Sequence, residues 1–476
     1  MYVTSAAESG LVRRPVGAVR LHPVDATHLA ELATQTAVHL RYDRRSEAWR
    51  QINCPRRVAE AILARGDWRE LPLLLGIAEA PTMTLDGRII DKPGYDRRSG
   101  LFLAAVPERY KSPSPTPTIQ EAQAAVDRLS EAVSTFPFVD RSDLAAFVAA
   151  VCTALVRRLL PAAPLIAITA PTPGTGKSLL ADLIAMIALG RQAAMLALSD
   201  DETENEKRLY SALLAGDSLI IADNIEAPLR GVLLCQLLTQ PSVQFRPLGF
   251  SSLVTAPTNT TLVATGNNLS IIGDLRRRVM LVRLDAKTER PETRAFARDA
   301  LEYVRQRRGE LVRDALTIMR GYAADGRPHV GVRPFGGFSE WDLMVRRAVV
   351  WAGLPDPLGP AEELRERDPD LEVTRMLFAA WRAEFGDHGV TVAEAIATAR
   401  KSHQRFDGGT EPDHPELREA LQAAAGDKLD SRRLAAWLRR HRDRVIDGLV
   451  LSQGEDRHAK VARWSVLDAA CGVMRG

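Results

Sequence analysis

The stretch LIAITAPTPGTGKS, residues 165–178, decides the fold of this chain. It begins with an apolar run that has no polar alternation, which is typical of a buried parallel strand. A loop rich in glycine and proline follows, and then the helical pattern SLLADLIAMIAL. A phosphate-binding loop requires this strand, loop and helix context. The stretch therefore predicts a nucleotide site, with an ordinary turn before a helix as the alternative.

Each residue of the loop has an expected role. Backbone N–H groups of Gly174, Thr175 and Gly176 turn toward the phosphates, and the N-terminus of the following helix adds a positive dipole end. Lys177 reaches the β- and γ-phosphates, and the Ser178 hydroxyl binds Mg²⁺. ATP and Mg²⁺ are thus the expected cofactors.

Two polar side chains end apolar strands further along the chain. SLIIADN carries Asp223, placed to hold Mg²⁺ through water, and TLVATGNN carries Asn267, an amide that can bind the γ-phosphate or the attacking water. Asn224 follows the aspartate, and an amide cannot act as a general base. Glu226 is a nearby substitute, but a solvated surface position is the favoured interpretation of this residue.

An arginine run follows in DLRRRVMLVRLD. Arg277 or Arg278, presented to the γ-phosphate of a neighbouring subunit, would act as an arginine finger. The alternative is a solvated basic run before a strand.

Two segments are candidates for DNA contact. VQFRPLGFSSLVTAPTNT consists of two extended pieces that we interpret as a hairpin, with Arg246 on a phosphate and Phe250 against a base. LAAWLRRHRDRV is a basic helix before a second hairpin, in which Arg439 and Arg440 would contact the phosphate backbone of DNA. A solvated helix face is the alternative for the second segment.

Composition sets the limits of the fold. A chain of 476 residues is too long for one ordinary core, and its net charge of +3 leaves only local basic faces to bind nucleic acid. The four cysteines form no C-x-x-C pair, so neither a zinc site nor a disulfide framework is predicted. No signal peptide or bilayer-spanning run is visible, so a cytoplasmic location without a membrane partner is expected.

Proline alternates with serine and threonine in KSPSPTPT, residues 111–118, which predicts a linker. Beyond it, apolar strands alternate with helices, which is typical of an α/β sheet built from βαβ units. We therefore expect four regions, which are an N-terminal accessory α+β module with its linker (1–118), a P-loop ATPase core (119–330), a helical region (331–405) and a winged-helix-like DNA-binding module (406–476).

The order of phosphate loop, Asp223, candidate hairpin, Asn267 and arginine run resembles that of superfamily 3 helicases. It looks closest to the helicase half of poxvirus- and phage-type primase-helicases. The pieces PTMTLDG, KPGYD, DNIEAPL and WDLMVRRAVVWAGLPDP are similar to helicase-like proteins of bacterial mobile elements. The resemblance covers roughly residues 55 to 400.

This resemblance implies an AAA+-like ATPase that assembles as a homo-hexamer and pulls single-stranded or forked DNA through its pore. By motif order it also implies that Lys177, Ser178, Asp223 and Asn267 have the roles given above and that Arg278 is the arginine finger. The implied function is an ATP-dependent DNA helicase or translocase in the replication of a phage, plasmid or integrated element. Primer synthesis is not predicted, so a separate primase or polymerase is an expected partner. The alternative is a non-translocating AAA+ switch, loader or initiator that assembles on DNA.

The sequence departs from the family pattern at two places. Pro171 stands where the phosphate loop usually has its first glycine, and the turn of the candidate hairpin has no lysine. Proline has no N–H to donate, but this position mainly ends the strand. The missing lysine puts strand engagement in doubt.

Overall fold

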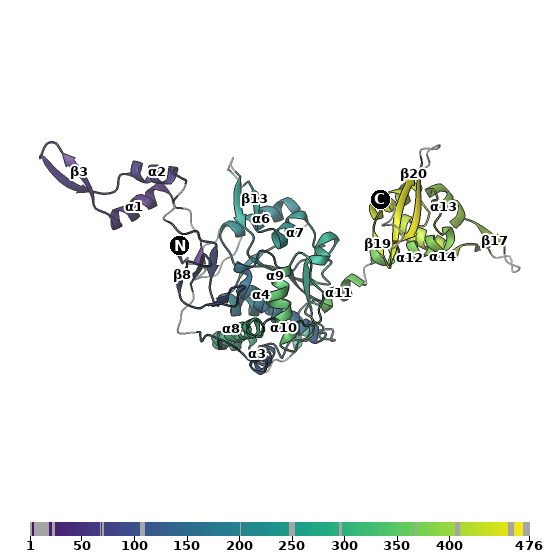
Figure 1. The fold of residues 1–476 in the computed structure, drawn as a ribbon, viewed down its shortest axis with the longest axis horizontal. Coiled ribbons are helices and arrows are strands. Elements are labelled where there is room, and N and C mark those ends of the chain that lie inside the picture. The colour runs from purple at the N-terminus through teal and green to yellow at the C-terminus, as the bar shows by residue number, and fades with distance from the viewer. Residues whose placement is uncertain are drawn as a thin grey trace. The chain divides into compact units, whose positions relative to one another are not determined.

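The computed structural model describes residues 2–3, 19–20, 24–66, 68, 71–104, 110–199, 201–246, 253–294, 298–366, 369–404, 410–455 and 461–469. The chain divides into two compact units, Met1–Glu362 and Glu363–Gly476 (Figure 1). Among the described residues, no helix has both the length and the apolar character that crossing a bilayer requires.

The centre of the first unit is a five-stranded parallel sheet in the order β11-β12-β15-β10-β16. The predicted buried strands LIAITA, SLIIAD and TLVATG form three of its members, so the prediction of a parallel α/β sheet is confirmed. β15 separates the strand of the phosphate loop from the strand before Asp223. The five strands are β10 (Leu165–Ala170), β11 (Ala194–Leu196), β12 (Leu219–Ala222), β15 (Thr261–Asn267) and β16 (Val279–Arg283).

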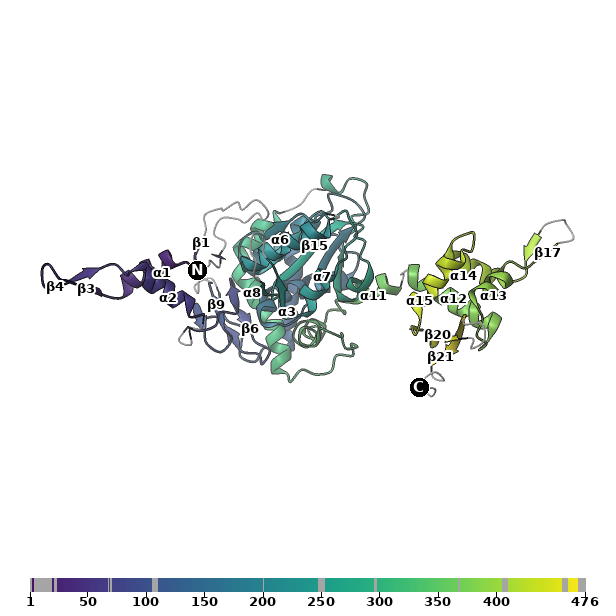
Figure 2. The ribbon, with the colours of Figure 1, turned by 90° about the horizontal axis from the view of Figure 1, so that it is seen from above.

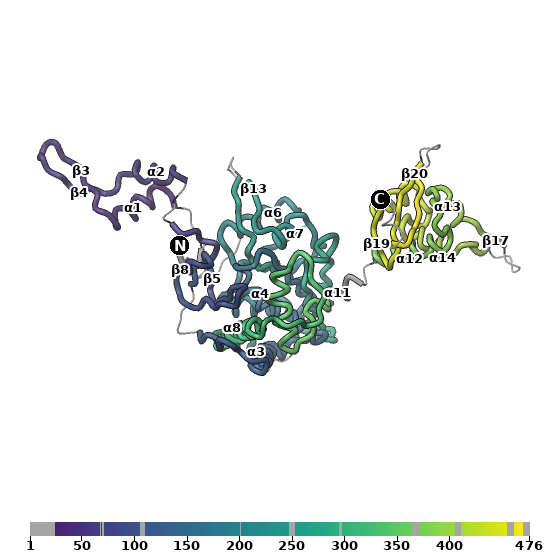
Figure 3. The backbone as a smooth tube through the Cα atoms, viewed as in Figure 1, coloured from purple at the N-terminus to yellow at the C-terminus, as the bar shows by residue number. Residues whose placement is uncertain are grey.

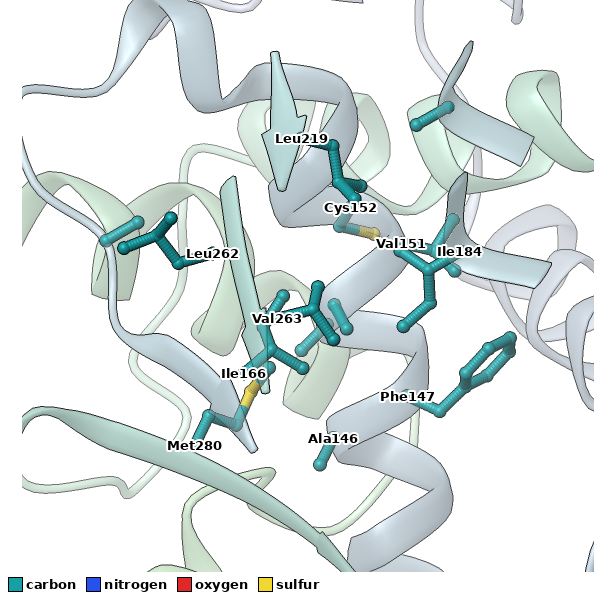
Figure 4. Close-up of a cluster of buried hydrophobic side chains, with 14 of the residues drawn as sticks. Ala146, Phe147, Val151, Cys152, Ile166, Ile184, Leu219, Leu262, Val263 and Met280 are labelled. Carbon is teal, nitrogen blue, oxygen red and sulfur yellow. The ribbon is translucent and has the colours of Figure 1, made fainter. Parts of the chain in front are cut away.

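Helices pack on this sheet, with α5 against β10 and β15 and α4 against β16. Helix α4 is apolar on nearly all sides and is buried, as expected for a helix in the centre of a large core. Figure 4 shows its Phe147 and Val151 near Ile166 and Val263, which come from two neighbouring strands. The helices around the sheet are α3 (Ile119–Ala132), α4 (Arg141–Val156), α5 (Lys177–Leu189), α6 (Glu202–Leu214), α7 (Val232–Thr239) and α8 (Ala300–Ala324).

A partly buried ion pair joins α3 to α8. Arg128 donates to both carboxylate oxygens of Asp314, from Nε at 2.8 Å and from Nη2 at 2.6 Å, and the Asp314 side chain is completely buried. Arg128→Ala would leave a buried carboxylate without its main partner, so we expect it to lower the free energy of unfolding by about 3 kcal/mol or more.

Thermal and urea denaturation measure this effect, with Arg305→Ala as the matched control. Arg305 also forms an ion pair on α8, with Glu302, but both side chains are largely exposed, so its loss should cost less than about 1 kcal/mol. Equal stability of the two variants would contradict the assigned role of the Arg128–Asp314 pair.

Residues 71–104 pack against the sheet domain rather than forming a separate body. Glu79 accepts two hydrogen bonds from Arg191, at 2.6 and 2.8 Å, and Arg158 donates to the carbonyl of Ile77. The expected linker is also held, because Arg320 of α8 donates to the carbonyl of Pro115. The strands here are β5 (Gly76–Ala78), β6 (Thr82–Met83), β7 (Ile89–Ile90), β8 (Gly94–Asp96) and β9 (Leu101–Leu103).

An α-β-β-α segment precedes these strands. It consists of α1 (Ala26–Thr36), β3 (His39–Asp43), β4 (Ala48–Ile52) and α2 (Arg56–Ala64). β3 and β4 pair as an antiparallel hairpin, and a further antiparallel pair joins β1 (Tyr2–Val3) to β2 (Val19–Arg20).

The boundary between the two units falls inside the expected helical region 331–405. Trp341 of α9 is fully buried in the core of the first unit, whereas Trp381 of α12 is fully buried in the core of the second. Apolar packing therefore divides this region near Glu362. Its elements are α9 (Ser339–Trp341), a π-helical turn (Asp342–Arg346), α10 (Arg347–Trp351), α11 (Gly359–Glu366), α12 (Pro369–Phe385) and α13 (Val392–Ala399).

The rest of the second unit is helix followed by sheet. The predicted basic helix and the hairpin after it are confirmed as α15 and β20–β21, and both share one apolar core with α12, α13 and α14. Figure 3 shows the backbone of this unit, with α12, α13, α14 and β20 labelled. The elements are β17 (Ser402–Gln404), β18 (Thr410–Pro412), α14 (Pro415–Ala425), α15 (Ser431–His441), β19 (Val445–Ile446), β20 (Leu449–Glu455) and β21 (Ala462–Asp468).

Candidate active site

The predicted site residues meet at the carboxyl edge of the central sheet. β10, β15 and β12 are parallel neighbours, and the pairing of Ala170 with Asn267 brings the end of β15 beside the start of the phosphate loop. Asp223 follows the last residue of β12 at the same edge. Ligands of open parallel sheets bind at this edge, because the loops there project from the ends of several strands.

The phosphate loop has the backbone that its glycines predict. β10 ends at Ala170, immediately before Pro171, so the proline does end the strand. Gly174 and Gly176 have φ values of 74° and 102°, which side chains rarely tolerate. Helix α5 begins at Lys177, and among the described residues no side chain caps its first turn. Its N–H groups and dipole are thus available to an anion.

Lys177 is buried at the mouth of this loop. Its Nζ donates to Asn267 Oδ1 at 2.6 Å and to the carbonyl of Thr172 at 3.2 Å. Burial lowers the pKa of Lys177, and the nearby Asp223 carboxylate partly opposes this. The contact between Lys177 and Asn267 brings together two side chains that the sequence separates by a whole βαβ segment.

Ser178 and Asp223 form the second contact of the site. The Ser178 hydroxyl donates to Asp223 Oδ1 at 2.7 Å. A hydroxyl and a carboxylate oxygen are ligands that Mg²⁺ accepts, and Mg²⁺ usually takes one or two carboxylates and completes its shell with phosphate and water. The described residues contain no cluster of three or more His, Cys, Asp or Glu side chains that could hold a metal.

Two residues of the site have no counterpart in the predicted set. The Thr265 hydroxyl donates to Asp223 Oδ1 and accepts the backbone N–H of Asn224 at 3.1 Å. Asp182 lies in the second turn of α5, where burial and then the Asp223 carboxylate raise its pKa. The only signal for Thr265 in the sequence is a hydroxyl residue within an otherwise apolar strand.

Asn224 and Glu226 lie on the turn that leaves β12. Asn224 has a φ of 52°, a left-handed conformation that asparagine tolerates better than most residues, and both side chains are exposed. Gly266 allows this turn to pass close to β15, since a Cβ there would lie 2.4 Å from the carbonyl oxygen of Ile225. The turn is therefore fixed, while the Glu226 carboxylate lies at the surface.

The two finger candidates differ in their surroundings. The Arg278 guanidinium is only 17% exposed and binds Asp274, the Thr239 hydroxyl at 2.8 Å and the Cys235 carbonyl, the last two on α7. Arg277 is 69% exposed and pairs only with Asp274 among the contacts of its side chain that the structure defines. Such an exposed pair costs little to break.

A cavity of about 510 Å³ adjoins the phosphate loop. It lies between the loop around Phe136, the Thr175–Gly176 part of the phosphate loop, and the start of α8. Phe136 contacts the loop closely, because a Cβ on Gly176 would lie 3.2 Å from its ring. An apolar, aromatic wall beside a phosphate site suits the flat face of a base.

The DNA-contact candidates lie on exposed positions where the structure describes them. β13 (Ser242–Phe245) and β14 (Val254–Pro257) pair as the predicted antiparallel hairpin, and Phe245, in the last pair before the turn, stacks on Tyr210 at 3.9 Å. Arg246 is exposed at the end of β13, and Phe250 lies outside the described residues. Arg439 and Arg440 are exposed on the last turn of α15.

No family model matches the chain, and no curated protein matches its sequence. Similar solved structures include the NrS-1 C-terminal region, with a TM-score of 0.40 and 13% identity over 94% of this chain and 100% of that chain. They also include the JCV helicase, with a TM-score of 0.24 and 12% identity over 52% of this chain and 61% of that chain. A third is the SCCmec type IV Cch helicase, with a TM-score of 0.33 and 14% identity over 88% of this chain and 83% of that chain.

Proposed function

We propose that this chain is an ATP-hydrolysing motor of the AAA+, superfamily 3 type that moves along a DNA strand. The observation that carries the proposal is the pair of contacts at the sheet edge, Lys177 to Asn267 and Ser178 to Asp223. They put a cation, an amide, a hydroxyl and a carboxylate beside an uncapped helix N-terminus. This is the set of groups that phosphoryl transfer needs around a nucleoside triphosphate.

The groups divide the work of hydrolysis. Amides of the phosphate loop and Lys177 bind the β- and γ-phosphates, and Asn267, now held by the lysine, orients the γ-phosphate or the attacking water. Mg²⁺ held near Ser178 and Asp223 would neutralise charge that develops on the phosphates. The cavity beside Phe136 takes the adenine base. Each role follows from the residues that lie around the expected positions of the phosphates, the Mg²⁺ ion and the base.

Assembly completes the site. Arg277 has an exposed guanidinium whose only defined ion pair is an i,i+3 contact, so it can reach a neighbouring subunit at small cost. Arg278 acts inside its own subunit, where it anchors the arginine run to the C-terminal end of α7. We therefore assign the finger to Arg277 in a homo-hexameric ring.

The DNA contacts come from the β13–β14 hairpin with Arg246 and from the winged-helix-like second unit with Arg439 and Arg440. Hydrolysis at subunit interfaces would move the hairpins along single-stranded or forked DNA. Such activity fits replication of a phage, plasmid or integrated element with a separate primase or polymerase.

The second candidate is a non-translocating ATP-dependent switch, loader or initiator. Asn224 favours it, because the position after Asp223 lacks a carboxylate to act as general base and Glu226 lies exposed beyond it. Slow hydrolysis suits a switch better than a motor.

One pair of measurements separates the two candidates. ATP turnover is measured with and without single-stranded DNA, and the mass in solution with and without nucleotide. The motor predicts turnover stimulated by the strand in a ring-sized assembly. Assembly on DNA with turnover unchanged by the strand would favour the switch, and absence of ATP binding would contradict both.

Thr265→Val tests how Asp223 is held. The substitution keeps the volume of the side chain but removes the donor to Asp223 and the acceptor of the Asn224 N–H. We expect kcat to fall by about tenfold, since one hydrogen bond to a charged group is worth about 1.5 kcal/mol or more. Because the hydroxyl orients Asp223, the Mg²⁺ concentration for half-maximal activity should also rise.

Thr265→Ser is the control. It keeps the hydroxyl, so its kcat and its Mg²⁺ concentration for half-maximal activity should stay close to those of the parent. A Thr265→Val enzyme with unchanged Mg²⁺ dependence would show that Thr265 does not position Asp223.

A further inference from the structure

Figure 2 shows the β3–β4 hairpin, whose strand pairing places different exposed side chains on its two faces. On one face Tyr42 lies directly opposite Trp49, with ring centroids 5.5 Å apart and planes at 63°. Leu40 extends this face, and the three side chains are 46%, 66% and 55% exposed, in the order Tyr42, Trp49 and Leu40. Aromatic side chains usually bury their rings, so an open pair marks a surface that takes a partner.

The opposite face is basic. Arg41 lies directly across from Arg50, although like charges in this position destabilise a hairpin. Asp43 pairs with Arg50 at 3.1 Å, which relieves part of this repulsion. Arg44 and Arg45 add two more exposed guanidinium groups at the turn.

The hairpin is held at its base by α1. The His39 ring lies 3.1 Å from the carbonyl of Ala33, and the backbone N–H of Cys54 donates to the Thr34 hydroxyl at 2.9 Å. A two-stranded ribbon alone is only marginally stable, so these contacts on both strands matter. They present the aromatic pair and the arginines on one fixed support.

We propose that this hairpin is a second binding site for single-stranded nucleic acid, separate from the β13–β14 hairpin and the second unit. The Tyr42–Trp49 pair stacks on an unpaired base, and the strand passes over the edge of the hairpin, so that the arginines of the turn and of the opposite face contact its flanking phosphates. Stacking combined with a basic surface is how sequence-independent single-strand binding is achieved. A protein partner would use the aromatic face alone and would not need the four arginines at the turn and on the opposite face, so charge favours the polyanion.

The test uses the full chain without nucleotide, so that its outcome does not depend on ATP hydrolysis. Affinity for labelled oligo(dT) and oligo(U) is measured by anisotropy, in an Arg439→Ala background that weakens the contact by α15. Trp49→Ala should lower affinity by about tenfold, because it removes one stacked base. Trp49→Phe keeps a ring and should retain most of the affinity, which also shows that the hairpin still folds.

The arginines are tested through salt dependence. Arg41→Ala combined with Arg50→Ala should reduce the slope of log affinity against log salt by about 1.4, since each single-strand phosphate contact contributes about 0.7. Arg56→Ala is the matched control, because Arg56 is an exposed arginine on α2, outside the hairpin, where it pairs with Glu60 at 2.9 Å. Its slope should equal that of the parent.

A direct readout is photo-crosslinking with 5-iodouracil, which should place the strand on the tryptic peptide Ser46–Arg50 that contains Trp49. The two nucleic acids distinguish a DNA site from an RNA site by their relative affinity. Unchanged affinity and salt slope in the Trp49 and arginine variants would overturn the proposal. So would a Trp49→Ala chain that binds oligonucleotides normally but no longer self-associates, since the face would then be a protein interface.

Discussion

Replacing Lys177 with alanine should reduce ATP turnover by about 10²- to 10³-fold, the usual effect of removing a group that stabilises transferring phosphoryl charge. The reason is local, because Lys177 is the cation at the mouth of the phosphate loop and its Nζ also holds Asn267 in place. One substitution therefore removes a phosphate contact and releases the amide. Steady-state ATPase assays measure the effect.

Lys207→Ala is the matched control, because this lysine pairs with Glu204 on the surface of α6 and its loss should leave turnover unchanged.

The pH profile gives a second readout of Lys177. Since burial lowers the pKa of Lys177 below the ordinary lysine value, kcat/KM for ATP should fall on the alkaline side earlier than an ordinary lysine would allow. Bound phosphates stabilise the protonated ammonium group of Lys177. Because kcat reports the enzyme–ATP complex, the alkaline fall of the kcat profile should lie at higher pH than that of kcat/KM. Turnover retained in Lys177→Ala would contradict the site.

Arg277→Ala should reduce turnover of the assembled protein by about 10³-fold, the lower end of the range for arginine fingers, while leaving nucleotide affinity nearly unchanged. The exposed guanidinium contributes little to its own subunit, so the fold should also be unchanged. Arg278→Ala is the contrasting variant. It removes the hydrogen bonds that Arg278 donates to the Thr239 hydroxyl and to the Cys235 carbonyl on α7, so we expect a lower melting temperature.

Mixing experiments test whether Arg277 acts on a neighbour. An Arg277→Ala subunit keeps an intact phosphate loop, and a Lys177→Ala subunit keeps an intact finger. Mixed assemblies therefore contain some complete interfaces, and their turnover should exceed that of either variant alone. Turnover equal to the mean of the two variants would place the finger elsewhere.

Much of the site follows from local sequence because its parts end strands of one parallel sheet. The glycines of the phosphate loop, Asp223 and Asn267 each follow an apolar run, and parallel pairing alone brings the ends of such runs to one edge. The distances of 2.6 and 2.7 Å that join these residues need only this topology. Pairing of the β13–β14 hairpin was predictable for a similar reason, since its two extended pieces are close in the chain.

Other features depend on tertiary packing and left little trace in the sequence. Arg277 and Arg278 are adjacent and chemically identical, and only the position of α7 makes one an internal anchor and the other an exposed group. Thr265 becomes a site residue because a neighbouring strand carries Asp223. The region 331–405 is helical throughout, yet apolar packing assigns Trp341 and Trp381 to different cores.

Strand displacement from a forked DNA duplex by the assembled protein is the decisive measurement of motor activity. A motor should release the labelled strand with ATP and Mg²⁺, but not with a non-hydrolysable analogue, and the Lys177→Ala variant should not release it. Hydrolysis that single-stranded DNA stimulates without any release of the strand would contradict a motor, and would leave the ATP-dependent switch as the function of this site.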